Sequence, residues 1–166
     1  MQDKQNPCRI SVRSLLMRPD EVKEIDLTVD AETAALYGIP CRELPKLEGK
    51  LENKAGVLML TYTLSCVPAL ICDRCLAPAE TPVREEFSHV VVTETASEQN
   101  DAEYLLAPDA MLDLAEVAMT DLRLSLPTKT LCKPDCLGIC PVCGQNRNEQ
   151  PCTCESADLT LDLQQS

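Results

Sequence analysis

The residues of this chain best suited to chemistry are its cysteines, of which there are 11 in 166 residues. Six of them fall in one short polar stretch, LCKPDCLGICPVCGQNRNEQPCTCE, at residues 131–155. Clustered cysteines bind metals, form disulfides or carry out thiol redox reactions. The count is odd, the chain is long for a disulfide scaffold, and its first residues, MQDKQNPCRI, do not resemble an export signal. The spacing therefore favours metal binding.

The motif CPVCG at 140–144 is the strongest single metal signal. Two cysteines separated by two residues in a tight turn present both thiolates to one tetrahedral ion, with zinc–sulfur bonds of about 2.3 Å. Pro141 stiffens such a turn, and Gly144 permits the positive φ that often follows the second ligand. The CTC motif supplies another pair across a loop that closes easily. The first expected zinc ligand set is Cys140, Cys143, Cys152 and Cys154.

Two further cysteines of this stretch, Cys132 and Cys136, can join an upstream CDRC motif that contains Cys72 and Cys75. In one interpretation these four residues form a second all-cysteine zinc site. In another, Cys132 or Cys136 replaces one sulfur of the CTC motif in a single site, and the remaining cysteines are spare. The ligand count therefore predicts one zinc ion and leaves room for a second.

The sequence gives little evidence for a catalytic site. A thioredoxin-like CxxC motif opens a helix, whereas CDRC is followed by LAPAETPV, which contains two prolines. The only histidine, His89, lies in a predicted strand, where we expect a structural role or solvent exposure. An all-thiolate zinc site leaves no position for water, and the sequence has no phosphate loop, nucleophile elbow or HExxH motif. We expect no enzyme activity.

The elements that must position the cysteines follow from hydrophobic periodicity. Alternation predicts a strand in EIDLTVD, a hairpin of KLEGKLE and VLMLTYTLSC around the turn NKAG, and a strand around 87–92. Asp30 is expected to cap a short helix, AETAALYG, and Asp113 a longer helix near 113–126 that Pro127 ends. The predicted fold class is α+β and mostly β, with an antiparallel sheet or partial barrel, one main C-terminal helix and a Cys-rich zinc knuckle.

The same patterns predict the domain organisation. We expect a β-rich domain at 1–127 with a mobile acidic loop near 95–110, where the sequence turns polar. A Cys-rich zinc knuckle at 128–156 is expected to pack on this domain, and residues 157–166 form a tail.

The charge of the chain indicates which kinds of molecule it can bind. The formal net charge is −12, and residues 94–121 contain eight acidic residues and no lysine or arginine. Such a surface repels phosphate backbones and suits a basic protein, or it serves solubility alone. Residues 105–166 contain no aromatic side chain on which a base could stack. Direct RNA binding is therefore expected to be weak or absent.

No apolar run approaches the roughly 20 residues that span a bilayer, so we expect a cytoplasmic protein without a membrane partner.

The ordered motifs resemble those of the bacterial YceD family, the large ribosomal RNA subunit accumulation proteins. The resemblance covers about residues 20–155 and is most specific in CDRCLAP and LGICPVCGQNRN. It is closest to the zinc-knuckle branch of that family, in which a Cys-rich end follows the helix. The resemblance implies a non-enzymatic role in accumulation of 23S ribosomal RNA, and hence in ribosome assembly.

Together with the composition, this resemblance yields one main hypothesis and two alternatives. The protein is expected to be an assembly factor that binds a basic ribosomal protein or a large-subunit assembly intermediate. The alternatives are a thiol-disulfide oxidoreductase that uses Cys72 and Cys75, and a structural zinc module of a larger complex.

Overall fold

A computed structural model gives the fold of the chain and describes residues 8–93 and 104–154. The chain divides into two compact units. The first lies within Met1–Ala69 and Glu80–Pro127, and the second within Leu70–Ala79 and Thr128–Ser166. The CDRC motif therefore belongs to the same unit as the Cys-rich stretch. The predicted packing of residues 128–156 on the β-rich domain stays a prediction, and both the tail at 157–166 and residues 95–103 of the predicted acidic loop lie outside the described residues.

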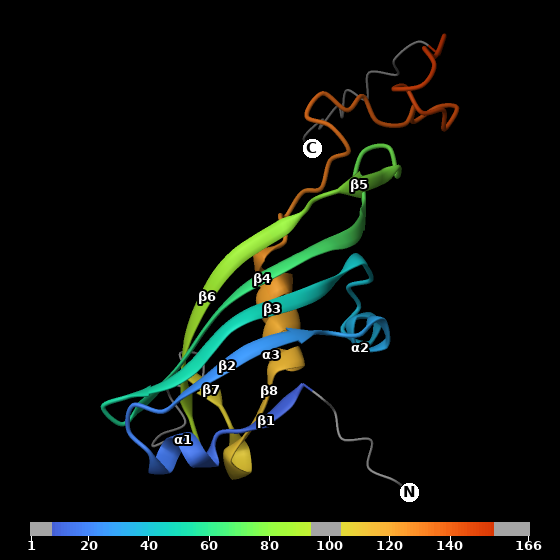
Figure 1. Ribbon diagram of the computed structural model, residues 1–166. Helices are drawn as coiled ribbons and strands as arrows, with labels where there is room; N and C mark the ends of the chain where they lie inside the picture. Colours follow the sequence, from blue (N-terminus) through green and yellow to red (C-terminus); the bar gives the residue numbers. More distant parts are fainter. Residues whose placement is uncertain (1–7, 94–103, 155–166) are drawn as a thin grey trace, which may run out of the picture. The chain divides into compact units, whose positions relative to one another are not determined.

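A mostly antiparallel sheet forms the body of the first unit (Figure 1). Its central strands are the predicted hairpin, and both residues of the connecting turn, Ala55 and Gly56, have positive φ, as a type I′ turn requires. The last strand of the sheet pairs in parallel. In sheet order the strands are β2 (Val22–Thr28), β3 (Cys41–Lys54), β4 (Val57–Ile71), β6 (Val83–Val92) and β7 (Tyr104–Leu106), and β5 (Pro78–Glu80) pairs with β4.

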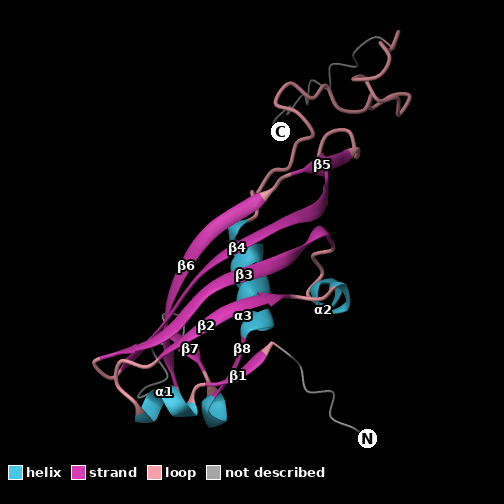
Figure 2. Ribbon diagram, in the orientation of Figure 1, coloured by secondary structure: helices cyan, strands magenta, loops and turns pink. Residues whose placement is uncertain are grey.

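Short elements complete the first unit. Strands β1 (Arg9–Ser11) and β8 (Met111–Asp113) pair in a separate small sheet. The helices are α1 (Arg13–Met17), α2 (Ala31–Leu36), the 3₁₀ helix η1 (Pro108–Ala110) and α3 (Leu114–Ser125). Strands outweigh helices throughout (Figure 2), so the mostly β fold class is confirmed. None of the helices in the described ranges has the length and apolar composition to cross a membrane.

Both predicted helix caps are confirmed. The Asp30 carboxylate accepts the N–H of Thr33 at 2.8 Å and begins α2. The Asp113 carboxylate accepts the N–H groups of Ala115 and Glu116 at 3.1 and 3.2 Å and begins α3. Each acceptor satisfies donors that the first turn of a helix leaves without an intrahelical partner.

A buried polar network joins α3 to one face of the sheet. Tyr62 of β4 is 1% exposed, and its hydroxyl donates to Asp121 Oδ2 of α3 at 2.5 Å. The same oxygen lies 2.6 Å from Nε2 of His89 on β6. Burial, followed by the hydrogen bond to Asp121, raises the pKa of Tyr62 far above its usual value, so the phenol stays a donor. His89 therefore helps to hold the helix on the sheet.

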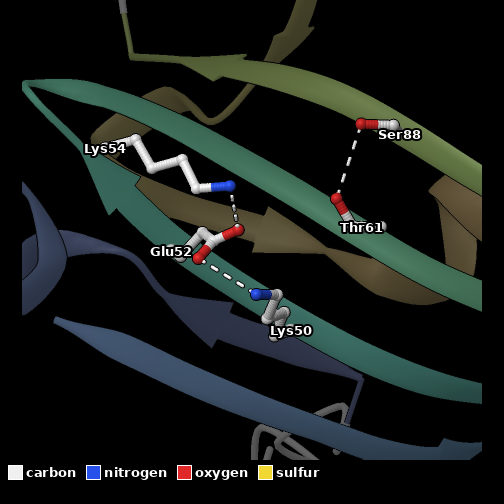
Figure 3. A network of polar contacts seen from close by, with 5 residues as sticks. All are labelled: Lys50, Glu52, Lys54, Thr61 and Ser88. Carbon is white, nitrogen blue, oxygen red and sulfur yellow. Dashed lines mark hydrogen bonds and ion pairs between the residues drawn. The ribbon is translucent and has the colours of Figure 1, made fainter. Parts of the chain in front are cut away.

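The opposite face of the sheet carries polar side chains (Figure 3). Glu52 forms ion pairs with Lys54 at 2.8 Å and with Lys50 at 3.1 Å. The Thr61 and Ser88 hydroxyls lie 3.4 Å apart between β4 and β6. Thr61 alternates along β4 with the buried Leu60 and Tyr62, as a sheet with one covered face requires, whereas Glu52 is itself only 8% exposed and has its charge paired with the two lysines.

Gly49 of β3 is expected to be intolerant of any side chain. It pairs with Tyr62 in the register, and a Cβ at position 49 would lie 2.2 Å from the Thr61 carbonyl oxygen and 2.4 Å from the Tyr62 Cα. Both are backbone atoms that move only if β3 and β4 separate. We predict that Gly49→Ala lowers the free energy of unfolding by roughly 2 kcal/mol or more, measured by urea denaturation. Thr63→Ala, on the polar face of β4, should cost only about 0.5 kcal/mol, and equal losses would contradict the packing argument.

Candidate metal centre

A short hairpin positions the last cysteines of the second unit. Ile139 and Asn146 form an antiparallel bridge, and the Cys140 N–H donates to the Gln145 carbonyl at 2.8 Å. At the tip, the N–H of Gly144 donates to the Cys140 carbonyl at 2.9 Å, and Gly144 has a φ of 73°. This is the left-handed conformation expected after the second ligand of a knuckle. The CPVCG motif therefore forms the tight turn that its sequence predicts.

The sulfurs of this hairpin gather into one group, the knuckle cluster, formed by Cys140, Cys143, Cys152 and Cys154. All four lie within 4.8 Å of one another. Cys152 Sγ is 3.3 Å from Cys140 Sγ and 3.9 Å from Cys143 Sγ. Bonds of about 2.3 Å to a tetrahedral ion place sulfurs about 3.8 Å apart, whereas a disulfide needs about 2.0 Å. The spacing therefore fits a metal ion held by four thiolates.

The other four predicted ligands form a second group, the bridging cluster, which consists of Cys72, Cys75, Cys132 and Cys136. Its sulfurs also lie within 4.8 Å of one another, with 3.7 Å between Cys72 and Cys136 and 3.5 Å between Cys75 and Cys132. Cys132 is exposed, while the other three are buried. This geometry again fits a tetrahedral metal ion.

Polar contacts hold the two halves of the bridging cluster together. The Asp73 N–H donates to the Thr130 carbonyl at 2.9 Å, and the Thr130 N–H donates to the Asp73 carboxylate at 2.6 Å. The guanidinium of Arg74 donates to the Cys136 carbonyl at 2.8 Å. These bonds place a turn at 72–75 against a segment that follows it by more than fifty residues in the sequence.

Electrostatics in each cluster favours a cation. The Cys143 N–H is the largest influence on Cys140 and lowers the pKa of its thiol to about 6. Burial opposes the thiolate of Cys72, but backbone N–H groups, that of Cys132 first, lower its pKa to about 6. Neighbouring sulfurs act in the opposite direction on Cys132 and raise its pKa to about 12. Four sulfurs this close cannot all ionise until a cation offsets their repulsion.

The structure thus brings the eight predicted ligands into two separate groups, each of which can hold a metal ion. It places Cys132 and Cys136 with Cys72 and Cys75 and not with the CTC motif. Cys8, Cys41 and Cys66, to which the sequence assigns no role, belong to the first unit.

Three supporting residues escaped the sequence analysis, namely Asp73, Arg74 and Asn148. Asp73 and Arg74 occupy the interior of a CxxC motif, where spacing rules say nothing about side chains. Asn148 donates from Nδ2 to Cys136 Sγ at 3.3 Å. Asn148 ends the motif LGICPVCGQNRN, but cysteine spacing assigns it no contact, because its loop contributes no cysteine between Cys143 and Cys152.

The local structure also bears on the oxidoreductase alternative. A turn follows Cys72, and the chain then enters β5 without forming a helix. A thioredoxin-like CxxC motif opens a helix. The CDRC sulfurs instead face two other cysteines, so the alternative is not favoured.

With this geometry established, comparison with known proteins identifies the family. The model of the large ribosomal RNA subunit accumulation protein YceD matches residues 60–163. This span covers more than half of the chain and includes every cysteine of both clusters. The chain belongs to the YceD family. Membership of the zinc-knuckle branch of the YceD family stays a prediction.

Curated relatives extend the similarity beyond the matched span. Uncharacterized protein Rv2926c of Mycobacterium tuberculosis and Uncharacterized protein Mb2951c of Mycobacterium bovis are each 25% identical to this chain over 154 residues. The alignment covers 88% of this chain and 73% of each relative. No solved structure matches the chain significantly.

Metal removal should unfold the second unit alone. Among its described residues, the hydrophobic cluster of this unit consists of Cys72, Cys75 and Cys136, with Ala77 and Leu131 packed against it. Metal–thiolate bonding can contribute on the order of 10 kcal/mol to such a small fold. We predict that native mass spectrometry of reduced protein finds two metal ions per chain, and that a strong chelator removes amide protection in the second unit while the first unit keeps it.

Single substitutions provide the controls for metal removal. Cys72→Ser should lose one metal ion, whereas Cys41→Ser, in the first unit, should retain both. A second unit that keeps its amide protection without metal would contradict the proposed dependence on metal.

Proposed function

We propose that this protein is a non-enzymatic assembly factor of the large ribosomal subunit that supports accumulation of 23S ribosomal RNA. The observation that carries the proposal is the match to the YceD family over residues 60–163. The cysteine clusters agree with a structural role, because four thiolates complete a tetrahedral site and leave no open position for a substrate.

We infer that the metal in both clusters is zinc. Soft thiolate ligands in tetrahedral geometry suit zinc, and CxxC knuckles supply such ligand sets. The observed sulfur separations of 3.3 to 3.9 Å support this assignment.

The partner proposed for this factor is a basic ribosomal protein or an assembly intermediate that presents one. A groove of about 250 Å³ lies beside α3 in the first unit, lined by apolar residues of β7, β8 and α3 and by three acidic residues. The acidic residues are Asp113, Glu116 and Asp121, and no lysine or arginine is among the described residues that line the groove. An apolar groove with negative charge suits a segment rich in lysine and arginine. Four other acidic residues of the 94–121 stretch, Glu94, Glu98, Asp101 and Glu103, lie outside the described residues.

The same charges argue against sustained direct contact with RNA. Affinity for nucleic acid depends chiefly on lysine and arginine that displace counterions from phosphates. The chain carries 15 basic residues against 27 acidic ones. We therefore propose that its effect on ribosomal RNA passes through a protein.

Depletion in the native host tests the ribosomal role. We predict that loss of the protein lowers the ratio of 23S to 16S ribosomal RNA and reduces free and assembled large subunits in sucrose gradients. The wild-type gene should restore both. An unchanged ratio and gradient would contradict the proposed function.

Charge reversal tests the protein partner. Glu116 is exposed and lines the groove, so we predict that Glu116→Lys weakens capture of basic ribosomal proteins by five- to tenfold, or about 1 to 1.4 kcal/mol. The measurement is a pull-down from lysate at moderate salt, followed by titration with the captured protein after purification. Glu43→Lys, an exposed change of equal charge outside the 94–121 stretch, is the matched control. Recovery of ribosomal RNA that survives removal of every ribosomal protein would contradict a protein-mediated role.

A further inference from the structure

Asn148 connects the two cysteine clusters of the second unit. It belongs to the loop between Cys143 and Cys152, which are both members of the knuckle cluster. Yet its Nδ2 donates to the sulfur of Cys136, a member of the bridging cluster, at 3.3 Å. Its Oδ1 accepts the N–H of Leu137, the next residue, at 2.9 Å. One side chain from the knuckle loop therefore contacts both a ligand of the other cluster and the residue that follows this ligand.

The orientation of Asn148 is fixed from within the knuckle hairpin. The Oδ1 atom of Asn146 accepts the backbone N–H of Asn148 at 3.1 Å and its Nδ2 at 2.8 Å. Asn146 itself pairs with Ile139 in the hairpin. The side-chain amide of Asn148 thus uses both N–H groups and its oxygen, and all three contacts depend on the loop being folded.

Backbone contacts join the two clusters through a shared segment of chain. The segment from Cys136 to Cys140 begins in the bridging cluster and ends in the knuckle cluster. On one side, the Ile139 N–H donates to the Arg74 carbonyl of the CDRC turn at 3.0 Å. On the other, the Arg147 N–H donates to the Gly138 carbonyl at 2.9 Å. A metal ion that orders the hairpin therefore also orders this segment and the side chain of Asn148.

We propose that Asn148 couples metal binding at the two clusters. When a metal ion closes the knuckle cluster, the folded loop places Asn148 Nδ2 against Cys136. An N–H···S bond stabilises a thiolate ligand, so the bridging cluster binds its own metal ion more tightly. By linkage, a filled bridging cluster strengthens metal binding at the knuckle cluster by the same factor. Asn148 is a positioning residue in this scheme. The coupling rests on the inferred metal sites and is independent of the ribosomal role.

The test is a zinc competition titration of the full-length reduced protein, followed by native mass spectrometry. Two equal independent sites would give a one-metal species of about half the protein at half saturation, and coupling predicts less. Affinity of the bridging cluster is then measured in a knuckle-disabled background, Cys140→Ser with Cys143→Ser. We expect that affinity to fall five- to tenfold relative to the otherwise intact protein.

A double-mutant cycle separates coupling from a merely structural contribution of Asn148. Asn148→Ala in the intact protein should weaken the bridging cluster by the same five- to tenfold, and in the knuckle-disabled background it should have no further effect. Asn148→Asp keeps the size and the acceptor for Leu137 but turns an anionic oxygen toward Cys136, so it should weaken the site more than alanine does. Gln145→Ala, which removes a hydrogen bond to Gln150 within the same loop, is the matched control and should leave the coupling intact.

The possible results separate the proposals. Two bound ions whose affinities are unaffected by Asn148→Ala would overturn the coupling and leave the metal sites in place. An equal effect of Asn148→Ala in both backgrounds would also overturn it, because a structural contact would then explain the loss. Absence of bound metal from every reduced preparation would overturn the metal sites and the coupling together, without bearing on the ribosomal role.

Discussion

The two groups of four cysteines, each able to hold a metal ion, are the feature on which the second unit depends. The sulfurs of Cys72, Cys75 and Cys136 are buried together, and among the described residues Ala77 and Leu131 add the apolar contact around them. Burial of so little apolar surface cannot offset the entropy of ordering two distant segments. Repulsion among four close sulfurs adds a further cost when they ionise. A bound cation reverses both effects, since it turns the repelling thiolates into ligands and fixes the segments that carry them.

The first unit reaches stability by the ordinary means of a sheet covered on one side. Aliphatic side chains fill the space between α3 and the sheet, and Tyr62, Asp121 and His89 form a polar network within it. The polar face of the sheet needs no cover, because its charges pair along β3 and its hydroxyls meet between strands. The two units thus differ in the interactions that stabilise their folds.

The sequence allowed prediction of the elements whose signal is local. Alternation defines the β3–β4 hairpin, and the aspartates before α2 and α3 define their first turns. The pairing of β1 with β8 and the parallel addition of β7 were not predicted, because three-residue strands carry no readable period.

The spacing of the cysteines also predicted the knuckle cluster as one ligand set. It left the partners of Cys132 and Cys136 open, since a segment more than fifty residues from the CDRC turn must be brought there by tertiary structure. Asn148 was missed for a related reason, because hydrogen bonds to sulfur follow no sequence pattern.

The formal charge of a metal-bound cysteine cluster affects which partner the protein can bind. A divalent ion held by four thiolates leaves two formal negative charges at each site, and the chain already carries a net charge of −12. Under the proposed zinc assignment, metal loading would make the protein a poorer ligand for a phosphate backbone at the same time as it orders the second unit. For a member of a family named for accumulation of ribosomal RNA, this net charge supports the proposal that the partner is a basic protein and not the RNA itself. The acidic chain would shield the positive charge of its partner until ribosomal RNA, with its higher density of phosphates, displaces it. In this scheme the negative charge of the protein favours capture of the basic partner before assembly. It also favours release of that partner onto the RNA.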